Sequence, residues 1–140
     1  PNYDDRLLEP TVLPGKFPNL LVNGGVGIAV GMATSLAPNN PVEVLDSIIR
    51  FIDDPEISLA ELMADVSEER DPAGKVTRPA RRGIKGPDFP TGGTILGRRG
   101  IVEAYDSGRG RVVLRGRVRT EPIEGSRDRQ QLVVEQVPFN

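Results

Sequence analysis

The sequence lacks cysteine, histidine and tryptophan altogether, and only 4% of its 140 residues are aromatic. Without cysteine the protein has no disulfide scaffold and no thiolate nucleophile. Because histidine is missing as well, the usual zinc ligands and the commonest general base are both absent. Several classes of enzyme are thereby excluded, and the lack of cysteine is compatible with a reducing cytoplasm.

Charge is nearly balanced over the whole chain, with 18 basic and 20 acidic residues and a net charge of −2. Its distribution is uneven. Between residues 98 and 119, seven arginines face only Glu103 and Asp106, so this window carries +5 and the rest of the chain −7. Such a window fits salt-dependent contact with phosphates. The alternatives are a solvated strand face and a face that binds acidic protein partners.

Residues 17–42 contain no charged side chain, which is longer than the roughly 20 apolar residues that a membrane-spanning helix needs. Four glycines, Asn23 and a Pro38-Asn39-Asn40-Pro41 break interrupt this run. We therefore expect a buried, glycine-rich core segment and no membrane partner.

The pattern of apolar residues and turn residues predicts an α+β fold, with a mixed or antiparallel sheet and flanking short helices. Residues 1–18 hold four prolines and should be extended or turning chain. Three helices are expected. The first covers residues 41–53 and is capped by Asn39 or Asn40, and the second begins at the capping box of Ser58. The third covers residues 99–107 and ends at Gly108. Strands are expected at residues 20–22, 94–96, 111–120 and 131–137, and a hairpin turn is expected over 124–129. Residues 27–32 fit either a strand or a helix. Residues 67–86 fit a surface loop.

The glycine-rich segment is the first candidate for a binding site. Gly24, Gly25 and Gly27 allow a backbone to approach a ligand closely, although they match neither a nucleotide P-loop nor a dinucleotide fingerprint. A tight turn between core strands is the alternative. In a loop that touches nucleic acid, the apolar side chain of Ile28 is suited to wedge between base pairs.

Catalysis by this chain alone is not expected. The adjacent acidic pairs Asp53-Asp54 and Glu68-Glu69 point apart on regular elements, so we interpret them as solvated charges. Tyr3 and Tyr105 have no histidine or other activating group, and we interpret both as packing residues. The basic window instead supplies candidate phosphate contacts, namely Arg98, Arg99, Arg109 and Arg111.

Six ordered motifs closely resemble the A subunit of bacterial DNA gyrase, a type IIA topoisomerase, and most of them also resemble the A subunit of topoisomerase IV. These are Asn2-Tyr3-Asp4, Pro18 to Gly24, Gly27 to Thr34, Gly86 to Thr91, Gly97 to Ile101 and Ser107 to Gly110. The resemblance covers nearly the whole chain, apart from residues 66–85. That stretch has the character of a loop insertion.

The resemblance implies part of a tower domain, an α/β unit that flanks the DNA gate. Residues 1–18 would be an extended proline-rich linker from a winged-helix domain, and residues 19–140 the N-terminal part of the tower domain. The family's A subunit cuts both DNA strands through a tyrosine that Tyr3 and Tyr105 do not match. By resemblance, Ile28 wedges into the bent gate duplex, and Asn23, Gly24, Gly25 and Gly27 lie against phosphates.

The resemblance also implies partners and cofactors. The partners are double-stranded DNA, a second copy of the A subunit, and a gyrase B subunit that handles ATP and the catalytic Mg²⁺. This chain should therefore hold no cofactor and be inactive alone. The expected location is the cytoplasm, at the nucleoid. Relatives often have Ser or Thr where this chain has Gly25 and Val26, so backbone N–H groups would have to replace hydroxyl contacts there.

Overall fold

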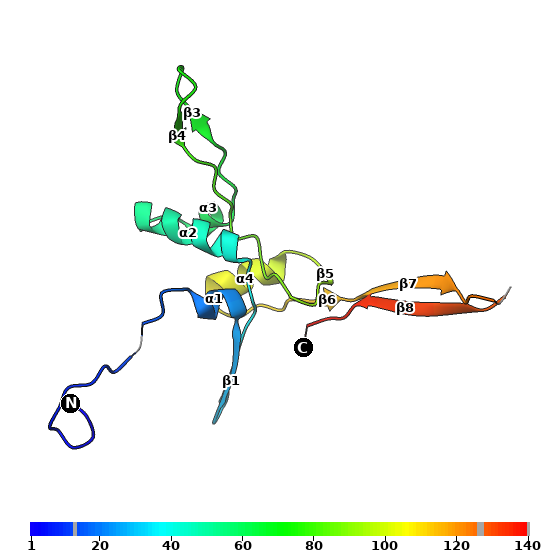
Figure 1. Ribbon diagram of the computed structural model, residues 1–140, viewed down its shortest axis with the longest axis horizontal. Coiled ribbons are helices and arrows are strands. Elements are labelled where there is room, and N and C mark those ends of the chain that lie inside the picture. Colours follow the sequence, from blue (N-terminus) through cyan, green and yellow to red (C-terminus); the bar gives the residue numbers. More distant parts are fainter. Residues whose placement is uncertain (13, 126–127, 140) are drawn as a thin grey trace.

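The computed structural model describes residues 1–12, 14–125 and 128–139, and it has an open shape with arms that project from a small helical centre (Figure 1). The helices are α1 (Asn19–Asn23), α2 (Pro41–Asp53), α3 (Leu59–Leu62) and α4 (Arg99–Ser107). The strands are β1 (Gly25–Ala29), β2 (Met32–Leu36), β3 (Glu69–Arg70), β4 (Val76–Arg78), β5 (Thr94–Ile95), β6 (Leu114–Arg115), β7 (Arg117–Pro122) and β8 (Gln130–Gln136). Four antiparallel pairs, β1–β2, β3–β4, β5–β6 and β7–β8, form separate two-stranded sheets. The expected α+β class is confirmed.

The apolar core is very small. Among the described residues, Val44 on α2 and Ile101 on α4 are the only large hydrophobic side chains that are fully buried. Most other large apolar side chains are partly or widely exposed. Because little hydrophobic burial is available, polar contacts have to fix much of the arrangement of the helices.

Helices α2 and α3 begin at the residues that the sequence predicted. Asn40 is the N-cap of α2, and its Oδ1 accepts hydrogen bonds from the backbone N–H groups of Val42 at 3.0 Å and Glu43 at 3.4 Å. Ser58 and Glu61 form the expected capping box of α3. Each such cap typically stabilises a helix by about 1 kcal/mol.

Arg50 joins α2 to the end of α3. Its buried guanidinium donates hydrogen bonds to the carbonyl oxygens of Glu61 at 2.5 Å and Ala64 at 2.9 Å. The last carbonyls of a helix lack partners within the helix and carry partial negative charge. The arginine therefore adds charged donors to the carbonyls at this helix end and holds the two helices together.

The strand expected at residues 20–22 is wrong, because these residues lie in the short helix α1. The carbonyl of Pro18 accepts the N–H groups of Leu21 and Val22, both at 3.1 Å, and Asn23 Nδ2 donates to Asn19 Oδ1 at 2.6 Å. The 5 residues of α1 are too few to show a helical period in the sequence, so short apolar runs of this kind are ambiguous.

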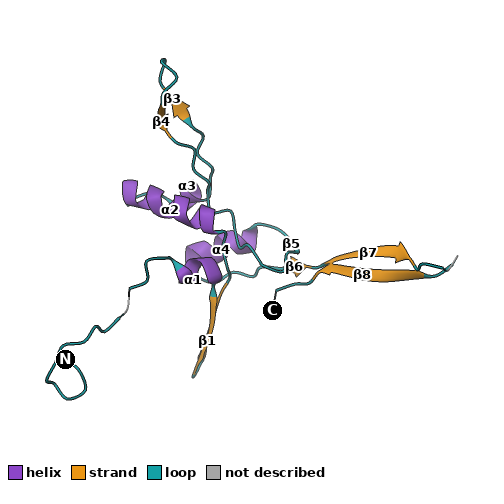
Figure 2. Cartoon of the chain, viewed as in Figure 1, coloured by secondary structure: helices purple, strands orange, loops and turns teal. Residues whose placement is uncertain are grey.

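The glycine-rich segment is not the buried core that we expected. It forms the β1–β2 hairpin, in which every strand residue is exposed, and it projects from the helical centre on the side away from the β3–β4 arm (Figures 1 and 2). The two strands pair from Gly25↔Leu36 to Ala29↔Met32, with Val30 and Gly31 in the turn. Gly31 has φ 77°, which a two-residue turn with a left-handed second position requires.

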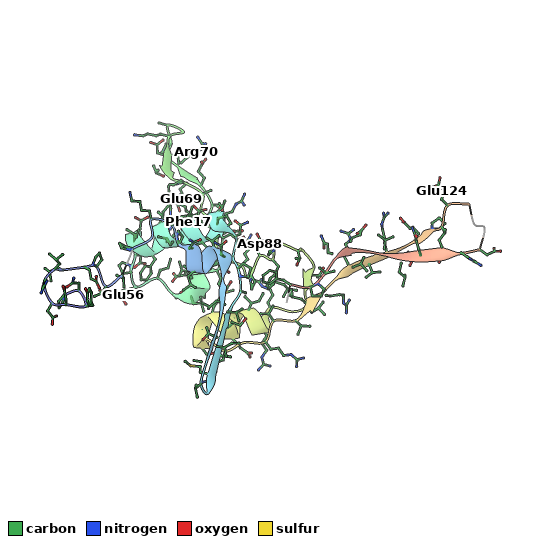
Figure 3. The ribbon with its side chains drawn as sticks, turned by 60° about the horizontal axis from the view of Figure 1, so that its bottom comes forward. Phe17, Glu56, Glu69, Arg70, Asp88 and Glu124 are labelled. Carbon is green, nitrogen blue, oxygen red and sulfur yellow. The ribbon has the colours of Figure 1, made fainter. Side chains whose placement is uncertain are left out.

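Residues 67–86 lie at the surface as expected, but part of this segment is regular. Strands β3 and β4 form a short hairpin arm, on which Figure 3 shows Glu69 and Arg70. Ion pairs hold the arm, including Arg70 with Glu68 at 2.6 Å and Lys85 with Asp65 at 2.8 Å. Local polar pairing thus orders a stretch whose composition is that of a loop.

The single strand expected over residues 111–120 is broken at Gly116. Residues 111–113 lie outside any strand, β6 pairs with β5, and β7 pairs with β8. A Cβ on Gly116 would lie 2.7 Å from the backbone oxygen of Gln136, so only glycine allows this close crossing. The β7–β8 hairpin extends far from the centre, with Glu124 near its end in Figure 3. The turn expected at 124–129 falls partly outside the described residues.

Two further expectations concern the membrane and Tyr3. No helix within residues 1–12, 14–125 and 128–139 is long and apolar enough to cross a bilayer. Tyr3 is 97% exposed, so its interpretation as a packing residue is wrong. Tyr3 lies in a turn that the Asn2 N–H closes on the carbonyl oxygen of Leu7 at 2.8 Å, and this turn leaves its side chain exposed.

Candidate nucleic-acid interface

The two faces of the β1–β2 hairpin differ in character. Directly opposed residues of an antiparallel pair share a face, so Val26 and Ile28 stand together above Ser35 and Ala33. Ile28 is 89% exposed. An unsupported isoleucine on a projecting hairpin is available to an external partner, whereas it contributes almost nothing to the core.

The opposite face of the hairpin has small residues along β1 and larger ones along β2. Gly25, Gly27 and Ala29 lie directly across from Leu36, Thr34 and Met32. A Cβ on Gly27 would meet no atom of the described chain within 4 Å apart from its neighbours in sequence, and its φ is not positive. The fold therefore has no need of glycine at this position, although it leaves the backbone open to close approach.

Gly24 has a structural reason to be glycine. Its φ is 68°, and a Cβ would overlap the backbone oxygen of Leu36. Gly24 therefore forms the crossing at the base of the hairpin. The neighbouring Asn23 is exposed at the end of α1, beside this base.

Asn39 anchors the base of the hairpin. It is buried, its Nδ2 donates to the carbonyl oxygens of Leu21 at 2.8 Å and Ala37 at 3.2 Å, and its backbone N–H donates to the carbonyl oxygen of Val22 at 3.0 Å. One residue thus holds the segment that enters the hairpin and the segment that leaves it.

Tyr105 on α4 completes this anchor. Its hydroxyl donates a short hydrogen bond to Asn39 Oδ1. Partial burial, with a smaller contribution from the nearby Glu43 carboxylate, raises the pKa of Tyr105 to about 12. The hydroxyl therefore stays protonated and remains a donor at neutral pH, and the interpretation of Tyr105 as a packing residue is supported.

The four candidate arginines lie around α4. Arg98 and Arg99 open the helix, and Arg109 and Arg111 lie in the loop that follows it. This loop crosses the first turn of α4 so closely that a Cβ on Gly100 would overlap the backbone oxygen of Arg111. We call these four exposed arginines the basic cluster; Arg99 also pairs with Glu103 at 2.7 Å.

Helix α4 connects the basic cluster to the hairpin anchor. Six residues separate Arg99 from Tyr105, which at 1.5 Å per residue is about 9 Å along the helix axis. Along β1, Ile28 lies four residues beyond Gly24, or about 13 Å from the base of the hairpin. The candidate contacts are therefore divided between α4 and the β1–β2 hairpin, and the Tyr105–Asn39 hydrogen bond joins the two.

The arginines on strand β7 are largely neutralised within their own hairpin. Arg117 and Arg119 on β7 both pair with Glu135 on β8, at 3.1 and 2.9 Å, and Arg119 also pairs with Glu121 at 3.1 Å. These arginines have nearby carboxylates to satisfy them. The surplus positive charge of the window is thus better placed in the basic cluster.

The whole chain matches one known protein family. The family model that describes the A subunit of DNA gyrase and topoisomerase IV aligns with residues 1–140. The chain belongs to this family. Similar proteins are the A subunit of DNA topoisomerase 4 from Staphylococcus epidermidis, 45% identical, and the DNA gyrase A subunits of Granulibacter bethesdensis, 46% identical, and Helicobacter pylori, 43% identical. Each alignment covers 99% of this chain and between 13% and 15% of the relative.

The relatives include gyrases and a topoisomerase IV at nearly equal identity, so the family of type IIA topoisomerase A subunits is the level that the comparison supports. The expected resemblance to the gyrase A subunit, with that of topoisomerase IV as its close alternative, is confirmed at this level. Among the described residues there is no group of three acidic side chains placed to hold a metal ion.

The link between Asn39 and Tyr105 has no local signal in the sequence. Asn39 stands out there only as a possible N-cap, a role that Asn40 fills, and its contact with Tyr105 spans 66 positions of the chain. The glycines of Gly-Arg-Arg-Gly and Ser-Gly-Arg-Gly were a usable signal for the basic cluster, because Gly100 and Gly110 meet at the crossing that forms it.

Proposed function

We propose that this chain forms the part of a type IIA topoisomerase A subunit that binds and bends the gate-segment duplex. The hairpin would insert Ile28 between base pairs, and Asn23, Gly24, Gly25, Gly27 and the basic cluster would lie against phosphates. The exposure of Ile28 on a projecting hairpin, whose strand β1 leaves its backbone open at Gly27, is the observation that carries the proposal.

The energetics favour a wedge on such a hairpin. Unstacking one base step requires a few kcal/mol, which the phosphate contacts permitted by a bend offset. Ile28 loses no core packing when it enters DNA, because it is already exposed in the free protein. The side chain is therefore available without a rearrangement of the fold.

The wider proposal follows the family. The chain would serve an enzyme that breaks, passes and reseals double-stranded DNA, as part of a tower domain, in an A-subunit dimer with B subunits that supply ATP handling and Mg²⁺. The cutting tyrosine would lie elsewhere in the full-length protein, so this chain would be inactive alone. The enzyme would act in the cytoplasm, at the nucleoid.

The test replaces Ile28 by alanine in the full-length protein. We expect reduced bending of a doubly labelled duplex by fluorescence transfer and reduced cleavage by the assembled enzyme, with an unchanged melting temperature because the side chain is solvent-exposed. Val30, which is fully exposed in the turn, provides a matched control as Val30→Ala. Unchanged bending in Ile28→Ala would defeat the proposal.

The rival function is a structural or protein-interaction module whose basic strand face binds acidic partners. The ion pairs of Arg117 and Arg119 weaken it, because those side chains already have carboxylate partners. A salt titration separates the two functions. Steep loss of duplex affinity with rising salt supports phosphate contact, whereas absence of duplex binding at low salt supports the rival.

A further inference from the structure

The β1–β2 hairpin has almost no apolar support at its base. Its strands are exposed throughout, and the two large buried hydrophobic side chains in the described part of the chain, Val44 and Ile101, lie on α2 and α4. A free two-stranded hairpin is marginally stable at best. The direction in which the hairpin projects must therefore depend on the contacts at its base.

Those contacts converge on one buried amide. Asn39 Nδ2 donates hydrogen bonds to the carbonyl oxygens of Leu21, before the hairpin, and Ala37, after it. Asn39 Oδ1 accepts a hydrogen bond from the Tyr105 hydroxyl on α4. Gly24 closes the same base by crossing the backbone at Leu36. Without the Tyr105 hydroxyl, both segments stay joined to each other, but their side-chain tie to α4 is lost.

The same helix carries the basic cluster, with Arg98 and Arg99 where it begins, Arg111 crossing its first turn and Arg109 just after its end. We infer that Asn39 and Tyr105 are positioning residues, which fix the angle between the Ile28 hairpin and the basic cluster so that both engage one bent duplex. This inference rests on the proposed DNA-bending function. On this inference, the degree of DNA bending depends on the angle between the hairpin and the basic cluster, whereas the affinity for the duplex comes mainly from the contacts themselves.

Two substitutions cut the link on either side of Asn39. Tyr105→Phe keeps the ring and removes the donor to Asn39 Oδ1, which separates the hairpin base from α4. Asn39→Asp keeps an acceptor for Tyr105 and removes the donors to Leu21 and Ala37. Because the second carboxylate oxygen of the aspartate would be buried facing the carbonyl oxygens of Leu21 and Ala37, Asn39→Asp is strongly disfavoured, and Tyr105→Phe is the variant that should keep the fold.

The experiment uses the full-length protein at saturating concentration on a doubly labelled duplex. For Tyr105→Phe we expect the ratio of bent to straight duplex to fall about fivefold, the equivalent of one net hydrogen bond. Duplex affinity at low salt should stay within about twofold, because the arginines and the hairpin surface remain. This split between bending and affinity is a readout that general loss of stability does not produce.

Ser58→Ala is the matched control. It removes the N-cap of α3 and lowers stability by an amount similar to the loss of one hydrogen bond, without touching the hairpin base or α4. Normal bending by Ser58→Ala, with reduced bending by Tyr105→Phe, supports the inference. Equal losses in both variants would overturn it, since global stability would then explain the result.

Comparison with Ile28→Ala distinguishes the two proposals. If Ile28→Ala reduces bending and Tyr105→Phe does not, the inference fails while the proposed function stands. If Ile28→Ala leaves bending unchanged, the proposed function fails and the inference fails with it. A reduced affinity in Tyr105→Phe that accounts fully for its reduced bending would also contradict the positioning role.

Discussion

Substitution of Gly27 by alanine tests whether the hairpin face that carries Gly27 meets DNA. In the free protein the change should be harmless, because a Cβ at this position would enter open space and the backbone φ is not positive. Glycine-to-alanine changes at compatible positions typically stabilise a protein by about 0.4–1 kcal/mol, since alanine restricts the unfolded chain. We therefore expect an equal or slightly raised melting temperature.

In the complex the same methyl group should be harmful. If a sugar–phosphate strand packs against Gly27 and its cross-strand partner Thr34, an added Cβ overpacks that contact. Overpacking of a close-packed site costs about 1–3 kcal/mol, which corresponds to about 5- to 150-fold in affinity. The signs of the stability change and the affinity change thus oppose each other.

Two other glycines of the hairpin serve as references. Gly24→Ala should lose stability, because φ is 68° and the Cβ would overlap the backbone oxygen of Leu36. Gly31→Ala has open space but φ 77°, so it should show only the strain of the left-handed conformation, about 1–2 kcal/mol. These two variants calibrate what backbone strain and steric overlap do at this hairpin.

The assay pairs thermal unfolding with duplex titration at fixed salt, on the full-length protein. A Gly27→Ala variant that binds and bends DNA normally would refute the close approach of a duplex to this face. A Gly27→Ala variant that unfolds earlier would refute the structural premise that the fold has no need of glycine there.

Two further predictions concern α4. Gly100→Ala should both lower the melting temperature and weaken duplex binding. The reason is that a Cβ at this position overlaps the backbone oxygen of Arg111 and forces apart the crossing that assembles the basic cluster. Weakened binding without a change in stability would contradict this prediction. Stability should also fall as the pH rises from about 10 to about 12, because the raised pKa of Tyr105 lets the unfolded state lose its proton first. Tyr105→Phe should remove that part of the pH dependence, and an unchanged profile would contradict it.

The capped helices could be predicted because their signals are local. Asn40 before Pro41 and the Ser58–Glu61 box lie within a few residues of the backbone groups that they satisfy. The same holds for Gly108, which ends α4 with φ 73°. Each of these features depends on residues that are adjacent in sequence, so no knowledge of tertiary structure is needed.

The errors over the glycine-rich segment and over residues 111–120 have a different cause, which is that packing between segments distant in sequence decides the outcome. The segment with Ile28 has the pattern of a core because it is apolar and uncharged, but no second layer covers its strands, so it stays exposed. Residues 111–120 have the pattern of one strand, but Gln136 crosses at Gly116 and divides it. Neither the crossing nor the missing layer is encoded by the local pattern.

The candidate site divides in the same way. The identities of Ile28, Gly27 and the arginines came from motifs and charge, whereas the link between the hairpin and α4 through Asn39 and Tyr105 came only from the structure. A protein with so little buried apolar surface cannot rely on core packing to set the angle between its arms. Because Asn39 and Arg50 are buried polar residues with several hydrogen bonds each, loss of a single partner leaves a donor or acceptor unsatisfied. Polar anchors of this kind fix orientation more sharply than contact between a few apolar side chains, and a wedge that must meet one base step depends on orientation.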